Sequence, residues 1–171
     1  KIPSGPTEFR GGRGRGVIAG GNTPSNTDTM TRIQISTAGN SVDFGNLTTA
    51  RRGNGSSTNS SSTRGVFNNG YVSAYTTAID YVTISSDGGA NDFGDVQNAI
   101  GNRTGFSNGV RGLIAGGLDA SDVWSNVIEF ITIATTGTAN NFGDMTRAQS
   151  HRSSAASPTR GVMMGGLYSG P

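Results

Sequence analysis

The chain of 171 residues contains no cysteine and only one histidine, one lysine and one tryptophan. Without cysteine, neither a disulfide nor a thiolate metal site can form. The single imidazole, His151, cannot by itself build a histidine-based zinc site or a repeated catalytic pair. No apolar run approaches the ~20 residues that a membrane helix needs, and no signal-peptide pattern opens the chain. We therefore expect no metal, no cofactor and no membrane contact.

Charge is also scarce, because charged residues make up 14% of the chain and the formal net charge is +2. This balance does not require a polyanionic partner. The run from Arg10 to Gly16 looks like an RGG box, the arginine-glycine segment of some RNA-binding proteins. However, its final Arg15-Gly16 recurs throughout the chain, so we interpret residues 1–14 as an N-terminal segment or cap and do not expect nucleic-acid binding.

Glycine is abundant, with 28 residues, and only 32% of the chain is hydrophobic. Composition alone would favour a disordered polar chain. The glycines, however, fall in register with an internal repeat, and short apolar runs recur at a fixed phase, as strands do. The sequence therefore predicts a folded repeat protein.

The repeat opens with an Arg-Gly dipeptide, an apolar pair and glycines, as in Arg15-Gly16-Val17-Ile18-Ala19-Gly20-Gly21. It returns at Arg64, Arg111 and Arg160, so the period is 49, 47 and 49 residues. The closing glycines are Gly20, Gly21, Gly70, Gly116, Gly117, Gly165 and Gly166, and a Phe-Gly marker follows in each full repeat at Phe44, Phe93 and Phe142. We divide the chain into repeats 15–63, 64–110 and 111–159, with 160–171 as the first strand of a fourth.

Each repeat contains a strand that is apolar on both faces. In the segment from Ile79 to Ile84, Ile79 and Tyr81 point to one side and Val82 and Ile84 to the other, because side chains alternate along a strand. Such a strand belongs to a sheet sandwiched between two others. The Arg-Gly run is a second strand and the Phe-Gly marker a short third.

The last segment of each repeat, at 49–57, 98–108 and 147–157, is small and polar. We expect it to form a fourth strand that makes a hairpin with the next Arg-Gly strand. Four short strands per ~50 residues, with a glycine pair closing one of them, resemble the kelch repeat of β-propellers. Asn69-Gly70 replaces the glycine pair in the second repeat.

The residue pattern of the repeat also resembles the repeat arrays in virion-associated proteins of marine tailed phages. These resemblances imply an all-β fold of kelch-like four-stranded blades, in a propeller or partial propeller. Three repeats are fewer than the four to eight blades that close a propeller. We expect a piece of a longer chain, several associating copies, or a cap formed by the N-terminal segment, and favour the first two.

Two aromatic residues, Tyr75 and Trp124, lie in equivalent inter-strand loops, where they could stack on a sugar or pack across the tops of the blades. Asp95 and Asp144 occupy matching positions, which indicates a turn or strand-end role. Asp119 and Asp122 lack the spacing of a calcium loop. No recognisable nucleophile, base and acid set is present, so we do not expect an enzyme.

The sequence thus favours a non-enzymatic structural or interaction module of a larger extracellular or virion assembly, such as a tail fibre or capsid appendage. Its partners would be other copies of itself or other virion or surface proteins. The alternative is a carbohydrate-binding adhesin that uses Tyr75 and Trp124 on host glycans. A propeller enzyme or an RNA-binding protein ranks third.

Overall fold

The computed structural model describes residues 14–53 and 58–168, and their regular structure consists of thirteen β-strands. Residues 1–13 lie outside the described residues. They include all of the predicted N-terminal cap except Gly14, and with it the RGG-like residues that precede Gly14. The strands are β1 (Arg15–Asn22), β2 (Asn26–Gln34), β3 (Val42–Asn46), β4 (Thr58–Ser60), β5 (Arg64–Asn68), β6 (Ala78–Thr83), β7 (Asn91–Asp95), β8 (Thr104–Ser107), β9 (Arg111–Ala115), β10 (Val127–Thr132), β11 (Asn140–Asp144), β12 (Ser153–Ala156) and β13 (Gly161–Met164).

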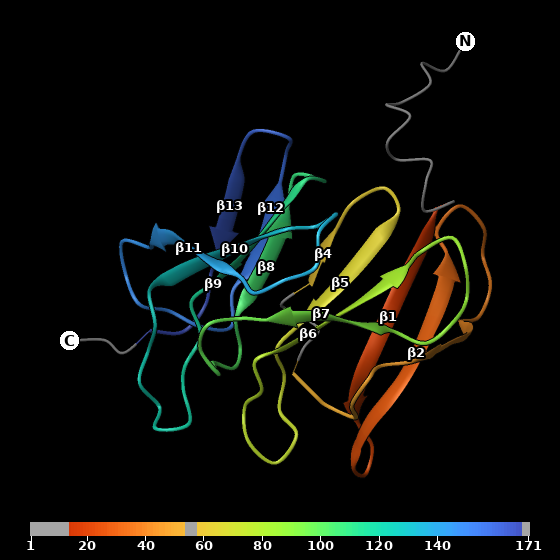
Figure 1. Cartoon of the computed structure of the whole chain (residues 1–171), viewed down its shortest axis with the longest axis horizontal. Helices are drawn as coiled ribbons and strands as arrows, with labels where there is room; N and C mark the ends of the chain where they lie inside the picture. The colour runs from red at the N-terminus through yellow and green to blue at the C-terminus, as the bar shows by residue number, and fades with distance from the viewer. Residues whose placement is uncertain (1–13, 54–57, 169–171) are drawn as a thin grey trace.

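These strands form four antiparallel sheets, which we number along the chain (Figure 1). Sheet 1 is β1-β2-β3, sheet 2 is β4-β5-β6-β7, sheet 3 is β8-β9-β10-β11, and sheet 4 is the pair β12-β13. The all-β prediction is confirmed. The described strands close into neither a barrel nor a propeller.

Each sheet from the second onward takes its first strand from the end of the preceding sequence repeat. β4, β8 and β12 pair with β5, β9 and β13 respectively, which confirms the predicted hairpins. In the first repeat this strand starts at Thr58, just beyond the segment 49–57 in which we expected it.

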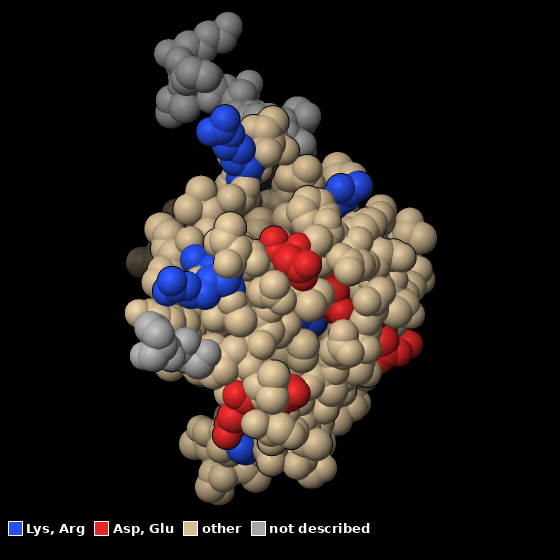
Figure 2. All heavy atoms as spheres, turned by 90° about the vertical axis from the view of Figure 1, so that its left-hand side faces the viewer, with Lys and Arg blue, Asp and Glu red and all other residues tan. Residues whose placement is uncertain are grey.

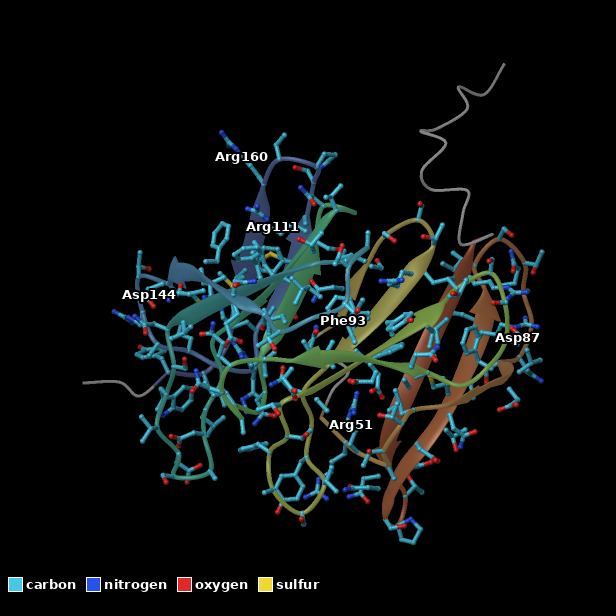
Figure 3. The ribbon with its side chains drawn as sticks, in the orientation of Figure 1. Arg51, Asp87, Phe93, Arg111, Asp144 and Arg160 are labelled. Atoms are coloured by element: carbon cyan, nitrogen blue, oxygen red, sulfur yellow. The ribbon has the colours of Figure 1, made fainter. Side chains whose placement is uncertain are left out.

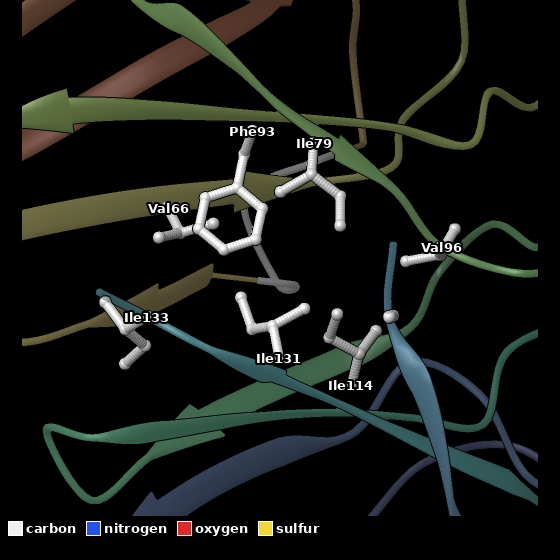
Figure 4. Close-up of a cluster of buried hydrophobic side chains, with 8 residues drawn as sticks. Val66, Ile79, Phe93, Val96, Ile114, Ile131 and Ile133 are labelled. Atoms are coloured by element: carbon white, nitrogen blue, oxygen red, sulfur yellow. The ribbon is translucent and has the colours of Figure 1, made fainter. Parts of the chain in front are cut away.

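Consecutive sheets pack face to face, because each presents apolar side chains to the next. Between sheets 1 and 2 the core contains Met30, Phe44, Leu47, Phe67 and Val82. Between sheets 2 and 3 the larger core (Figure 4) contains Val66, Ile79, Phe93, Val96, Ile114, Ile131, Ile133 and Ala139. The Phe-Gly marker thus supplies one phenylalanine to each of these two interfaces.

The prediction of a doubly buried central strand is confirmed for β6. Ile79 is fully buried toward sheet 3, and Val82 is buried toward sheet 1. In β2, by contrast, Ile33 occupies the position of Val82 and is exposed. The same residue pattern is therefore buried on both sides only in a sheet with a neighbour on each side.

The first strands of the sheets also lie next to one another. The Ser107 hydroxyl on β8 donates to the Ser60 carbonyl on β4 at 2.8 Å, and the Ser154 hydroxyl on β12 donates to the Gly105 carbonyl at 2.8 Å. Small polar side chains fit here because these strands approach closely. This explains why the last segment of each repeat is rich in serine and glycine.

The glycine pairs serve both purposes that glycine allows, a positive φ and a close backbone approach. Gly116 has a φ of 65° and Gly117 a φ of 104°, and a Cβ at Gly117 would overlap the Gly101 carbonyl. Asn69, which replaces the first glycine in the second repeat, has a φ of 57°. Asparagine tolerates this left-handed conformation better than most residues, so the departure from Gly-Gly keeps the backbone unchanged.

Candidate functional site

Tyr75 lines a cavity of about 410 Å³ between loops of repeats 1 and 2. Its walls are Arg52, Gly53, Gly70, Tyr71, Tyr75, Gly101 and Asn102. The Tyr71 and Tyr75 rings meet edge to face with centroids 5.5 Å apart, and the Arg52 guanidinium lies 4.4 Å from the Tyr71 centroid. The cavity thus combines aromatic rings with a cation and an amide.

The structure does not bring Tyr75 and Trp124 together in this cavity. Trp124 lies in the loop after β9, where it forms a backbone bridge with Leu118, and it is half-buried. Tyr75 forms the equivalent bridge with Tyr71, and its ring lies where a Cβ at Gly101 would be. The two aromatic residues are therefore structural equivalents in successive repeats and lie in separate places.

A second candidate is the outer face of sheet 1. Ile18 and Ile33 lie on the face opposite the core, and Ile35 follows at the end of β2. Their exposed fractions are 57%, 36% and 70%, whereas Val82 and Ile84, which match Ile33 and Ile35, are buried. This face has the composition of an internal sheet interface without a described partner.

The opposite end of the molecule, formed by sheets 3 and 4, is also apolar. Phe142 is 48% exposed, although its equivalents Phe44 and Phe93 are 2% exposed, and Val162, Met164, Leu167 and Tyr168 are exposed nearby. Figure 2 views the molecule from this side and shows mainly uncharged atoms with scattered charges of both signs. Both ends thus expose side chains that are buried where two sheets meet.

Two buried ion pairs lie where consecutive sheets meet, and no sequence pattern predicted them. Arg51 lies in the chain after sheet 1. Its guanidinium group contacts the Asp80 carboxylate of β6 at 3.1 Å and donates to the Phe67 carbonyl at 3.3 Å. Arg103 pairs in the same way with Glu129 of β10 and donates to the Ile114 carbonyl at 3.1 Å. All four charged side chains are at most 1% exposed.

Burial lowers the pKa of both guanidinium groups, Arg51 and Arg103, against the opposing influence of their carboxylates. Each carboxylate is also held by the backbone of the preceding sheet. Thr48 N–H donates to Asp80 at 3.0 Å, and Gln97 N–H donates to Glu129 at 3.1 Å. The two carboxylates thus join consecutive sheets, and burial keeps both ion pairs from a substrate.

An exposed ion cluster joins sheets 1 and 2 at the turn before β7, around Asp87, which Figure 3 labels. Arg32 Nε donates to Asp87 at 2.7 Å, and Arg15 donates to the same carboxylate at 3.1 Å. The hydrogen bond from Arg32 lowers the pKa of Asp87 below its ordinary value. The cluster marks one edge of the sheet 1–sheet 2 interface.

The remaining candidates occupy local structural positions. His151 has a φ of 52°. Gly53 and Asn102, which occupy the same position in the first two repeats, have φ values of 74° and 52°. This position of the repeat is therefore a left-handed turn. The Thr77 hydroxyl donates to Asp95 at 2.7 Å at a strand end. Asp119 accepts N–H groups from Ser121 and Val123 in its own loop.

No protein-family model matches the chain, and a search of curated proteins finds no similar protein. Within residues 14–53 and 58–168, no helix is long and apolar enough to cross a membrane.

Proposed function

We propose that the protein is a non-enzymatic structural module, a partial β-propeller of kelch-like blades that joins a larger assembly through its exposed sheet ends. The observation that carries this proposal is the exposure of Ile33 and Ile35 at one end and Phe142 at the other. Their equivalents are buried inside the same chain. Repeat arrays need their terminal apolar faces covered, by capping units or by partners.

The proposed partners are other copies of the chain or other surface or virion proteins, as in a tail fibre or capsid appendage. A head-to-tail contact between unlike ends closes a ring or extends a filament, depending on the rotation between copies. The resemblance of the repeat to arrays in virion-associated proteins of marine tailed phages supports a virion or extracellular location.

Sedimentation velocity over a wide concentration range tests this function. We expect reversible association that weakens when Ile35 or Phe142 is replaced by serine, because each change removes apolar area from an end. Val123→Ser is the matched control, since Val123 is 59% exposed on a loop. A chain that stays monomeric at every concentration would contradict self-assembly.

The loop cavity favours carbohydrate binding as a second candidate function. An aromatic ring beside an arginine and an asparagine can stack on a sugar while the polar groups bond its hydroxyls. Because Trp124 lies outside this cavity, glycan binding on an array should be lost in Tyr75→Ala and kept in Trp124→Ala. Binding that survives Tyr75→Ala would exclude the cavity as the site.

A further inference from the structure

A third arginine, Arg152, occupies the same structural position as Arg51 and Arg103 but has no carboxylate. Its Nη2 donates to the Met163 carbonyl of β13 at 3.0 Å, just as Arg51 and Arg103 donate to the matching carbonyls of β5 and β9. Its Nη1 lies 3.6 Å from the Met145 sulfur. Among the described residues, no Asp or Glu forms an ion pair with Arg152.

The missing carboxylate has a defined place. Asp80 lies opposite Phe67 in the β5–β6 register, and Glu129 lies opposite Ile114 in the β9–β10 register. The equivalent residue of β13 is Met163, and β13 pairs only with β12 in the described sheet. The open edge of β13 is therefore where a strand with an acidic residue would pair.

The neighbouring Phe-Gly strand has an open position of the same kind. Inside the chain, the Phe93 carbonyl accepts Gly137 N–H at 2.7 Å, and the Asp95 carbonyl accepts Ala139 N–H at 2.8 Å, both from the turn of the next sheet. A Cβ at Gly94 would overlap the Gly137 carbonyl, whereas the space next to Gly143, its equivalent, is empty. The site at β11 thus has the shape to receive a glycine turn.

We propose that the β11–β13 end binds an acidic β-hairpin of the repeat's own type, supplied by another polypeptide. The hairpin's first strand adds to the edge of β13, and its Asp or Glu pairs with Arg152 opposite Met163. Its glycine turn then packs on Gly143 and donates to the carbonyls of Phe142 and Asp144. Strand addition of this kind supplies main-chain hydrogen bonds, and the buried ion pair supplies specificity.

Two features of the chain select this partner. The same geometry is already present twice, at Asp80 and at Glu129, so the site continues an interface that the fold uses. Sheet 1 of a second copy would bring Thr31 to this position, because Thr31 matches Asp80 in the repeat, and threonine has no charge to offer Arg152. The inference rests on the proposed function, since it names the partner of one sheet end.

The chain contains its own probe for this site. A fluorescent peptide of residues 78–97, which spans β6 and β7, should bind the full protein and slow amide exchange in β13. The matched peptide with Asp80→Asn, and the protein variant Arg152→Met, should bind roughly ten- to a hundredfold more weakly, the range expected for a hydrogen bond to a charged group. Arg32→Met in sheet 1, at the opposite end, should leave the affinity unchanged.

Equal affinity for the two peptides, no binding of the unmodified peptide, or exchange protection outside β11–β13 would each overturn the proposal. The peptide comparison uses the unmodified protein, so it decides the matter even if Arg152→Met does not fold. The proposed function is tested separately by sedimentation. A monomeric protein that binds the acidic peptide would contradict self-assembly alone, and a self-associating protein that ignores the peptide would contradict the acidic hairpin alone.

Discussion

At the scale of single residues, three arginines occupy equivalent places in the fold although the sequence repeat does not align all of them. Arg103 and Arg152 each precede the next Arg-Gly dipeptide by eight residues, but Arg51 precedes it by thirteen. Alignment therefore places Arg51 in another column. All three guanidinium groups nevertheless donate to matching carbonyls, those of Phe67 in β5, Ile114 in β9 and Met163 in β13.

Removing a partner from a buried ion pair leaves an uncompensated charge, which is costly. We expect Arg103→Met to lower the free energy of unfolding by about 3–5 kcal/mol, because it leaves the buried Glu129 carboxylate without its cation. Arg152→Met is the control and should cost no more than about 1.5 kcal/mol, because it loses one hydrogen bond to a carbonyl. Urea denaturation measures both, and similar losses would contradict the role assigned to Glu129.

At the scale of the strand, the Phe-Gly marker is preserved because it performs three tasks at once. In the first two repeats its phenylalanine fills the core between sheets, and its carbonyls accept N–H groups from the next sheet's turn. Its glycine leaves room for that turn and has a φ of 140°, 135° or 141° in the three repeats. The sequence predicted a strand at this marker, but its contact with the following turn became visible only in the fold.

Alanine substitutions at the equivalent glycines Gly94 and Gly143 distinguish the effect of backbone strain from that of steric overlap. Their φ values are 135° and 141°, so an alanine at either position carries similar strain, of about 1–3 kcal/mol. Only at Gly94 would the added Cβ overlap the Gly137 carbonyl. We expect Gly94→Ala to be less stable than Gly143→Ala by about 1–3 kcal/mol in thermal or urea unfolding. Equal losses would mean that the turn moves away freely.

At the scale of the whole molecule, the sheets follow one another as in other repeat proteins, and each described sheet packs mainly on its sequence neighbours (Figure 1). Among the residues that the structure describes, sheet 2 is covered on both faces and sheet 1 on one. Stability should therefore differ along the chain even where the repeats are alike.

Native-state hydrogen exchange reads this difference directly. Amides of β6 should exchange at least about tenfold more slowly than those of β2, its equivalent in sheet 1, because opening β6 exposes two packed faces. The difference in exchange rate between β2 and β6 should decrease at high protein concentration if copies of the chain cover the ends. Equal rates in a dilute monomeric sample would contradict the uneven burial of the two sheets.

The sequence by itself determined the all-β class, the repeat and the hairpin between successive repeats. These features follow from alternating apolar residues and turn glycines, which act within about 50 residues. The tertiary structure decided which arginine meets which carboxylate and which copy of a repeated residue is exposed. Ile79 and Phe93 are buried while Phe142 is not, because burial depends on whether another sheet lies beside the strand. The repeat thus specified one kind of interface, and the fold decided where it is filled and where it stays open.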